Sequence, residues 1–88
     1  MKLKLSYETM ELDDQIVAIP VGESGQTYQG VIKLNDTAAF ILSLLKEEIS
    51  EEDIVRILSE EFEAPEEQIT TDVHEYLEEF RARGLLEE

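Results

Sequence analysis

The sequence contains no cysteine, no tryptophan and only one histidine. Without cysteine, the chain has no disulfide framework, no thiolate nucleophile and no zinc or iron–sulfur site that needs cysteine ligands. No apolar run approaches the roughly 18 residues that a membrane-spanning helix needs, and acidic residues follow the first lysines before any signal-like segment. We therefore expect a cytoplasmic protein without a metal or a cofactor.

Basic residues are also scarce: 7 Lys and Arg stand against 22 Asp and Glu, a formal net charge of -15 over 88 residues. Residues 1–46 hold six acids and four bases, whereas residues 47–88 hold sixteen acids and three bases. Binding to nucleic acid depends on basic groups that neutralise phosphates, so this balance excludes it. The hydrophobic content of 42% still allows one small domain with a true core.

The first third of the chain shows strand-like patterns. Three segments are predicted to form an antiparallel meander: residues 7–12, 15–21 and 31–34. Residues 15–21 are short and rich in β-branched side chains, and Asp13-Asp14 before them indicates a turn. Residues 22–26 contain two glycines and predict a loop.

The rest of the chain shows an apolar period of about 3.6 residues, which predicts helices. Three are expected: residues 36–48, 51–62 and 65–83. Asn35 and Ser50 are good N-caps for the first two, and Pro65 suits the first position of the third. Gly84 is well suited to ending the third helix.

This order predicts one α+β domain over residues 1–88, a winged helix-turn-helix-like fold with a three-stranded antiparallel sheet followed by three helices. We expect Leu85 and Leu86 to fold back on the sheet. In a DNA-binding winged helix the third helix would enter the major groove. Here residues 65–83 present six acids on that helix, which argues against DNA.

No catalytic constellation is present. His74 lacks metal-binding spacing and has no serine or lysine tied to it by a motif, so we expect a surface histidine. The paired acids lie on the polar faces of predicted helices, without a calcium-binding loop, and the glycines form no phosphate-binding motif. The protein is therefore not expected to be an enzyme.

The run from Ile32 to Leu42, IKLNDTAAFIL, resembles the LN-[DE]-TAA-x-IL signature of PqqD-like proteins. Residues 62–69, FEAPEEQI, are similar to the family's joint of an aromatic residue, proline, glutamate and isoleucine, and residues 83–86, RGLL, complete the pattern. The resemblance covers residues 30–86. The strands before it match only in type, because the tryptophan common near the family's second strand is absent.

PqqD-like proteins hold the leader segment of a ribosomally made precursor peptide and present the precursor to a modifying enzyme, often a radical S-adenosylmethionine enzyme. In the family, the leader adds as a strand to the edge of the third strand and lies beside the third helix. The resemblance therefore implies a non-catalytic peptide chaperone. The implied strand edge is Gly30, Val31, Ile32, Lys33 and Leu34, and the implied groove wall is Val73, Tyr76, Leu77 and Phe80.

Some alternatives stay open at this point. Val73, Leu77 and Phe80 lie at helical spacing and are also expected in a core, whereas Tyr76 can place its hydroxyl at a rim. Lys33 could meet a leader carboxylate. An unpaired edge could also pair with a second copy to form a dimer.

A second functional interpretation is an accessory or regulatory subunit that docks on an enzyme through its acidic helical face, around Glu75, Glu78 and Glu79, without binding a leader. A third is a degraded fragment of an enzyme. The residues do not favour pyrroloquinoline quinone over another modified peptide as the product, and they do not identify the precursor.

Overall fold

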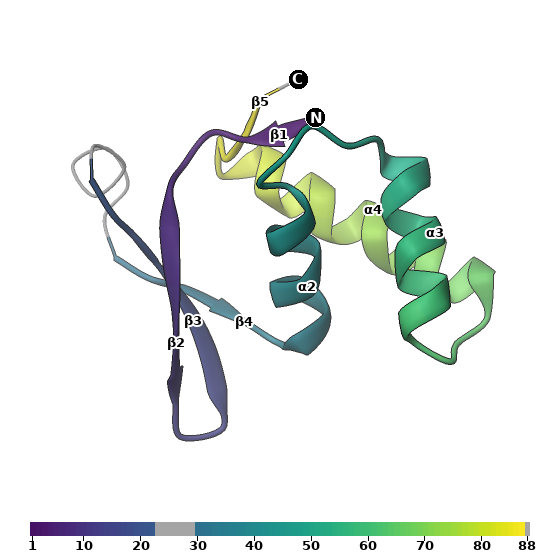
Figure 1. Ribbon diagram of the computed structural model, residues 1–88, viewed down its shortest axis with the longest axis horizontal. Coiled ribbons are helices and arrows are strands. Elements are labelled where there is room, and N and C mark those ends of the chain that lie inside the picture. Colours follow the sequence, from purple (N-terminus) through teal and green to yellow (C-terminus); the bar gives the residue numbers. More distant parts are fainter. Residues whose placement is uncertain (23–29, 88) are drawn as a thin grey trace.

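The structure, a computed structural model, describes residues 1–22 and 30–87 (Figure 1). Its elements follow in this order: β1 (Lys2–Leu3), β2 (Tyr7–Leu12), β3 (Gln15–Pro20), β4 (Ile32–Leu34), α2 (Asp36–Leu44), α3 (Glu51–Glu61), α4 (Glu66–Ala82) and β5 (Leu86–Glu87). Within these residues, three helices stand beside a three-stranded antiparallel sheet, as the sequence predicts. Of the loop predicted at 22–26, positions 23–26 lie outside the described residues.

Strands β2, β3 and β4 form one antiparallel sheet in that order. β2 pairs with β3 along its whole length, starting with Tyr7 opposite Pro20, and the hairpin turns at Asp13 and Asp14 as predicted. Asp13 has a φ of +57°, a left-handed conformation that aspartate tolerates better than most residues. β3 ends at Pro20, and one further backbone bond follows it, from the N–H of Val21 to the carbonyl of Ser6 at 3.0 Å.

Helix α2 begins as predicted and ends early. The Oδ1 of Asn35 accepts a hydrogen bond from the N–H of Ala38 at 2.8 Å and so caps the helix. The predicted end at residue 48 is wrong, because the helix stops at Leu44. Glu47 and Glu48 would lie in the last turn of a longer helix, where the helix dipole disfavours negative charge.

Helices α3 and α4 differ from their predicted bounds by one residue at three ends and not at all at the fourth. The Ser50 hydroxyl accepts a hydrogen bond from the N–H of Asp53 at 3.1 Å, as its predicted role as an N-cap requires. Pro65 is itself the cap of α4 instead of its first residue, and it makes no side-chain capping bond. The two helices pack against each other through their apolar stripes.

The C-terminal end of α4 turns sharply. The N–H of Gly84 donates to the carbonyl of Arg81 at 2.9 Å, and the N–H of Leu85 donates to the carbonyl of Phe80 at 3.0 Å. This pair of bonds is the Schellman motif, which needs a left-handed residue after the helix. Gly84 has a φ of +72° and meets that need.

The turn leads Leu85 and Leu86 away from the three-stranded sheet, contrary to the prediction. β5 pairs with β1 in a separate two-stranded sheet, with Leu86 opposite Leu3. The N–H of Lys4 also donates to the carbonyl of Leu85 at 2.7 Å. The strand β1 was not predicted. It forms because Leu3, at 6% exposure, enters the core and brings the backbone of the N-terminal segment beside the C-terminal one.

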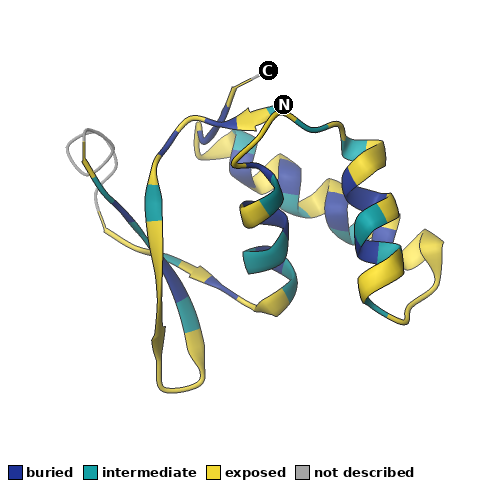
Figure 2. Cartoon of the chain, viewed as in Figure 1, coloured by how far each residue is buried: buried dark blue, intermediate teal, exposed yellow. Residues whose placement is uncertain are grey.

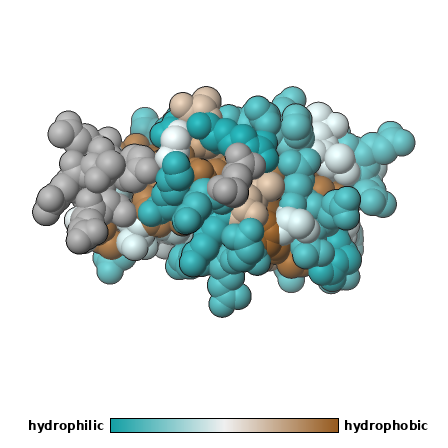
Figure 3. Space-filling view, turned by 90° about the horizontal axis from the view of Figure 1, so that it is seen from above, coloured by the Kyte–Doolittle hydropathy of each residue, from teal (hydrophilic) through white to brown (hydrophobic). Residues whose placement is uncertain are grey.

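The core lies between the three helices and one face of the sheet. In Figure 2 the buried faces of α2, α3 and α4 are turned inward, and the hairpin of β2 and β3 extends away from the helices. The largest fully buried side chains are, by decreasing volume, Ile41, Leu42, Leu45, Ile54, Leu58, Leu77, Leu85 and Val73. Hydrophilic side chains cover most of the face seen in Figure 3, and apolar ones show in patches between them. Among the described helices, none is long and apolar enough to cross a membrane.

Candidate functional site

Strand β4 lies at one edge of the three-stranded sheet. It pairs with β3 on one side, and across the parts of the chain that the structure describes no strand lies against its other side. An unpaired strand edge presents N–H and C=O groups that can bind the backbone of another chain. Val31, directly before the strand, is 51% exposed, although its side chain is large and apolar.

Side chains along β4 point alternately to the core and to the solvent, and this decides which of them another molecule can contact. Ile32 packs on the core and Leu34 is buried within it, whereas Lys33 is exposed and opposite Val17 in the register. Gly30, with a φ of +87°, turns the chain into the strand. The predicted edge residues therefore offer their backbone at 32–34 and the side chains of Val31 and Lys33.

The end of β4 is tied to α4 by Asn35. Its amide nitrogen donates a hydrogen bond to the hydroxyl oxygen of Tyr76 at 2.7 Å, while its Oδ1 caps α2. Tyr76 is half-buried, with its ring packed against the core. One polar side chain thus holds the middle of α4 beside the end of the edge strand.

The predicted groove wall divides into core and surface residues. Val73 and Leu77 are 0% exposed and Phe80 is 3% exposed, so these three side chains belong to the core. Only Tyr76 of the four presents surface beside β4. That these residues contact a peptide stays a prediction.

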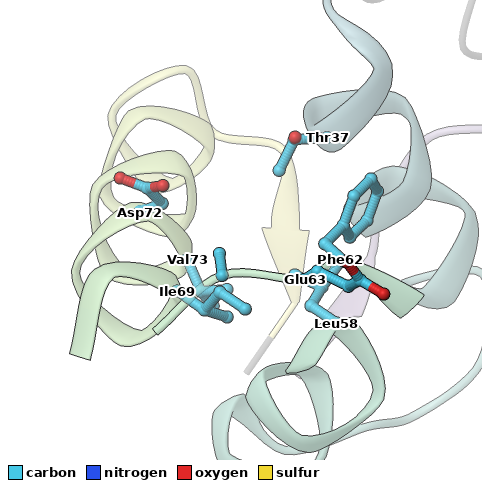
Figure 4. A pocket seen from close by; sticks show the side chains of 8 residues that line it. Thr37, Leu58, Phe62, Glu63, Ile69, Asp72 and Val73 are labelled. Carbon is cyan, nitrogen blue, oxygen red and sulfur yellow. The ribbon is translucent and has the colours of Figure 1, made fainter. Parts of the chain in front are cut away.

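A pocket of about 310 Å³ lies beside α4 at Asp72 and Val73, one helical turn before Tyr76. It is lined by Thr37, Leu58, Phe62, Glu63, Ala64, Ile69, Asp72 and Val73. In Figure 4 the side chains of Ile69 and Val73 face Leu58 and Phe62 across the pocket, and Thr37 closes a third side. The pocket therefore lies where α2, α3 and α4 meet, and it can take an apolar side chain.

Phe62 is a residue of this pocket that the sequence motifs marked only as part of a joint. It forms the C-cap of α3 and its ring meets that of Phe40 edge to face, with centroids 5.8 Å apart and planes at 81°. Edge-to-face aromatic pairs add to the apolar burial of both rings. The sequence did carry a signal for Phe62: it is an aromatic residue at the end of an apolar helical stripe, just before Ala64-Pro65.

The single histidine of the sequence lies at the surface of α4. His74 has a side chain 59% exposed, and its Nδ1 lies 3.5 Å from a carboxylate oxygen of Glu51. This contact is a surface pair between α4 and α3. Searching residues 1–22 and 30–87 gives no group of three His, Cys, Asp or Glu side chains arranged to hold a metal ion.

The family model described as "Coenzyme PQQ synthesis protein D (PqqD)" matches residues 5–86. The chain belongs to the PqqD family. The match includes β2 and β3, which the sequence motifs alone had left outside the resemblance. No curated protein matches the chain.

Two solved structures share the fold of this PqqD-family chain. One is described as "TbiB1 in Complex with the TbiA(beta) Leader Peptide" and has a TM-score of 0.71, 23% identity, and coverage of 99% of this chain and 95% of its own. The other, "Lasso peptide synthetase B1 complexed with the leader peptide", has a TM-score of 0.68, 22% identity, and coverage of 97% and 96%. At these identities the likeness establishes the fold.

The family motif has a clear place in the PqqD fold. The run from Ile32 to Leu42 spans the edge strand β4, the Asn35 cap and most of α2. Asn35, the asparagine of the motif, therefore connects the end of β4 to α2 through the cap and to α4 through its bond with Tyr76. The run thus contains the backbone of the candidate edge and the exposed Lys33, whereas Val31 and Tyr76 lie outside it.

Proposed function

We propose that this PqqD-family protein binds the leader segment of a precursor peptide as an added strand on β4 and presents the precursor to a modifying enzyme. Strand addition uses backbone hydrogen bonds for affinity and side-chain pockets for selectivity. Both parts of that mode are available here, at the edge of β4 and in the pocket where α2, α3 and α4 meet.

The observation that carries the proposal is the edge of β4, which no strand of the described residues covers and which the bond between Asn35 and Tyr76 holds next to α4. The two similar structures are both described as complexes with a leader peptide, which supports the same use of the fold here. The Lys33 ammonium group, exposed on the edge strand, would favour a leader with a carboxylate at this position.

We infer that the protein takes no part in the chemistry itself. Its contribution is to raise the local concentration of the precursor at the enzyme, which needs binding but no reacting group. The family resemblance favours a radical S-adenosylmethionine enzyme as the recipient, and we include that partner in the proposal.

A titration of the ¹⁵N-labelled protein with the leader of a precursor encoded beside its gene tests the binding mode. We expect chemical-shift changes at Val31 to Leu34 and at Tyr76. A leader with N-methyl groups at alternate residues keeps its side chains but loses the N–H donors of one edge, and it should bind far more weakly. Lys33→Glu should weaken an acidic leader by about fivefold, as expected for an exposed charge pair.

Absence of shifts at Val31 to Leu34 on addition of the leader would contradict strand addition. The alternative, an enzyme-docking subunit that binds no leader, places the interaction on the exposed acids of α4. Glu78 and Glu79 are already paired with Arg81 and Arg83, which weakens that interpretation. The triple variant E75Q/E78Q/E79Q should leave leader binding unchanged if our proposal holds, and should abolish enzyme docking if the alternative holds.

A further inference from the structure

Three of the four lysines of the chain line a single pocket. Lys2, Lys4 and Lys46 lie around a cavity of about 460 Å³. Its other lining residues are Leu3, Leu5, Ser6, Tyr7 and Glu87. The chain has a net charge of -15, so a cluster of three positive side chains makes the charge of this part of the surface opposite to that of the whole protein.

The backbone brings these lysines together. Lys2 and Lys4 are exposed, whereas Leu3 and Leu5 beside them are buried, and both lysines line the pocket. The N–H of Leu3 donates to the carbonyl of Leu45 at 2.9 Å, which places that segment against the end of α2. Lys46 follows directly and is thereby carried to the same pocket.

The ring of Tyr7 holds the Lys46 side chain in place. Its Nζ lies 5.0 Å from the centre of the Tyr7 ring, a cation–π contact. Burial raises the pKa of the Tyr7 hydroxyl above its usual value of 10, so the phenol stays neutral near pH 7. The contact therefore orients the ammonium group and leaves its positive charge available.

The arginines of the chain differ from these lysines. Each is paired with a carboxylate of its own helix: Arg56 with Asp53, Arg81 with Glu78, and Arg83 with Glu79. Within the described ranges, by contrast, no ion pair involves Lys2, Lys4 or Lys46. The pocket has one carboxylate, Glu87, so three positive charges less one negative charge leave a formal +2.

We propose that this pocket binds an extended acidic peptide segment of a partner protein, with carboxylates at alternate positions. Alternate side chains of an extended partner chain leave the same face, so its carboxylates can meet Lys2 and Lys4, which line one pocket. The pocket adjoins the C-terminal end of α2, where the helix dipole is negative and opposes a dianion such as phosphate more than single carboxylates.

This surface is distinct from the one proposed for the leader. Tyr7 belongs to β2, which lies at the edge of the sheet opposite β4. An acidic segment could therefore occupy the lysine pocket while a leader occupies the edge of β4. The inference goes beyond the proposed function and does not depend on it.

A peptide titration followed by NMR tests the inference at about 0.1 M salt, where long-range repulsion by the acidic helices is screened. The probe is an acetylated and amidated hexapeptide that alternates glutamate with threonine, and its control has glutamine in place of glutamate. We expect shifts at Lys2, Lys4 and Lys46 with the glutamate peptide only. The variant K2Q/K4Q/K46Q should lose about tenfold or more in affinity, since three exposed charge contacts disappear.

The matched control is R56Q/R81Q/R83Q, which removes the same number of positive charges outside the pocket. It should keep most of the affinity. Equal losses in both triple variants, or equal binding of the glutamine peptide, would overturn the inference, because either would mean that no local site exists. Inorganic phosphate that binds the lysines as tightly as the peptide would overturn the assignment to a peptide. The leader titration of the lysine variant, read at Val31 to Leu34, separates this outcome from failure of the proposed function.

Discussion

At the scale of single residues, Asn35 makes the two bonds on which the candidate site depends. Its Oδ1 caps α2 at the N–H of Ala38, and its amide nitrogen holds the hydroxyl of Tyr76. The cap was predictable, since asparagine before an apolar helical pattern is a local signal. The bond to Tyr76 was not, because it joins positions 41 apart in the sequence and depends on how α4 packs.

Replacing Asn35 by alanine should lower the free energy of unfolding by about 1 to 2 kcal/mol, because both the cap and the bond to Tyr76 are lost. Tyr76→Phe removes the second bond alone and should cost less than about 1 kcal/mol. Urea unfolding followed by circular dichroism measures both changes. If the two variants cost the same, the cap contributes nothing and Asn35 is not the residue that fixes the start of α2.

At the scale of elements, the hairpin of β2 and β3 and the helices α3 and α4 follow from local patterns, because each carries its own periodicity and its own turn or cap. β1 and β5 do not. Each has two residues, too few to show a period, and each forms only because the other lies opposite it. The early end of α2 could not be predicted either, because the apolar spacing continues past Leu44. Glu47 and Glu48, which disfavour a longer helix here, are ordinary residues on the surface of other helices.

Gly84 lies in the turn between α4 and β5, and substituting it tests how much that turn contributes to stability. Gly84→Ala should lower the free energy of unfolding by about 1 kcal/mol, because alanine must adopt a positive φ there. The space around the position is open, so no clash adds to this cost. Gly84→Asn should recover part of the loss, since asparagine tolerates the left-handed conformation.

Urea unfolding gives the free energies of the Gly84 variants, and hydrogen exchange of the Lys4 amide reports whether the two-stranded sheet loosens. An alanine variant as stable as the parent protein, with unchanged exchange at Lys4, would mean that the turn is not what directs β5 onto β1.

At the scale of the whole molecule, an apolar core is enclosed by a surface of strongly negative charge. The excess of acids, and its concentration after residue 46, is visible in the sequence alone. The candidate edge at β4 followed from the family resemblance. The pocket where α2, α3 and α4 meet could not be predicted, because three helices contribute its walls and no single segment carries its pattern.

The charge predicts the response of stability to salt. Self-repulsion among the acids destabilises the compact chain more than the expanded one, and salt screens that repulsion. Raising sodium chloride from about 0.02 M to about 0.5 M should therefore move the urea midpoint upward. A midpoint that falls with salt would instead mean that the exposed ion pairs, such as Arg83 with Glu79, outweigh the repulsion.

The pairing of β1 with β5 brings residue 2 directly opposite residue 87, and Figure 1 shows these two strands side by side. A domain whose ends meet in one ladder can be inserted into a surface loop of a host protein with little cost in loop closure. The edge of β4 is not used in that ladder and would stay accessible. The same fold can thus be carried inside a larger chain, attached through the two-stranded sheet, with the candidate edge of β4 on the other sheet.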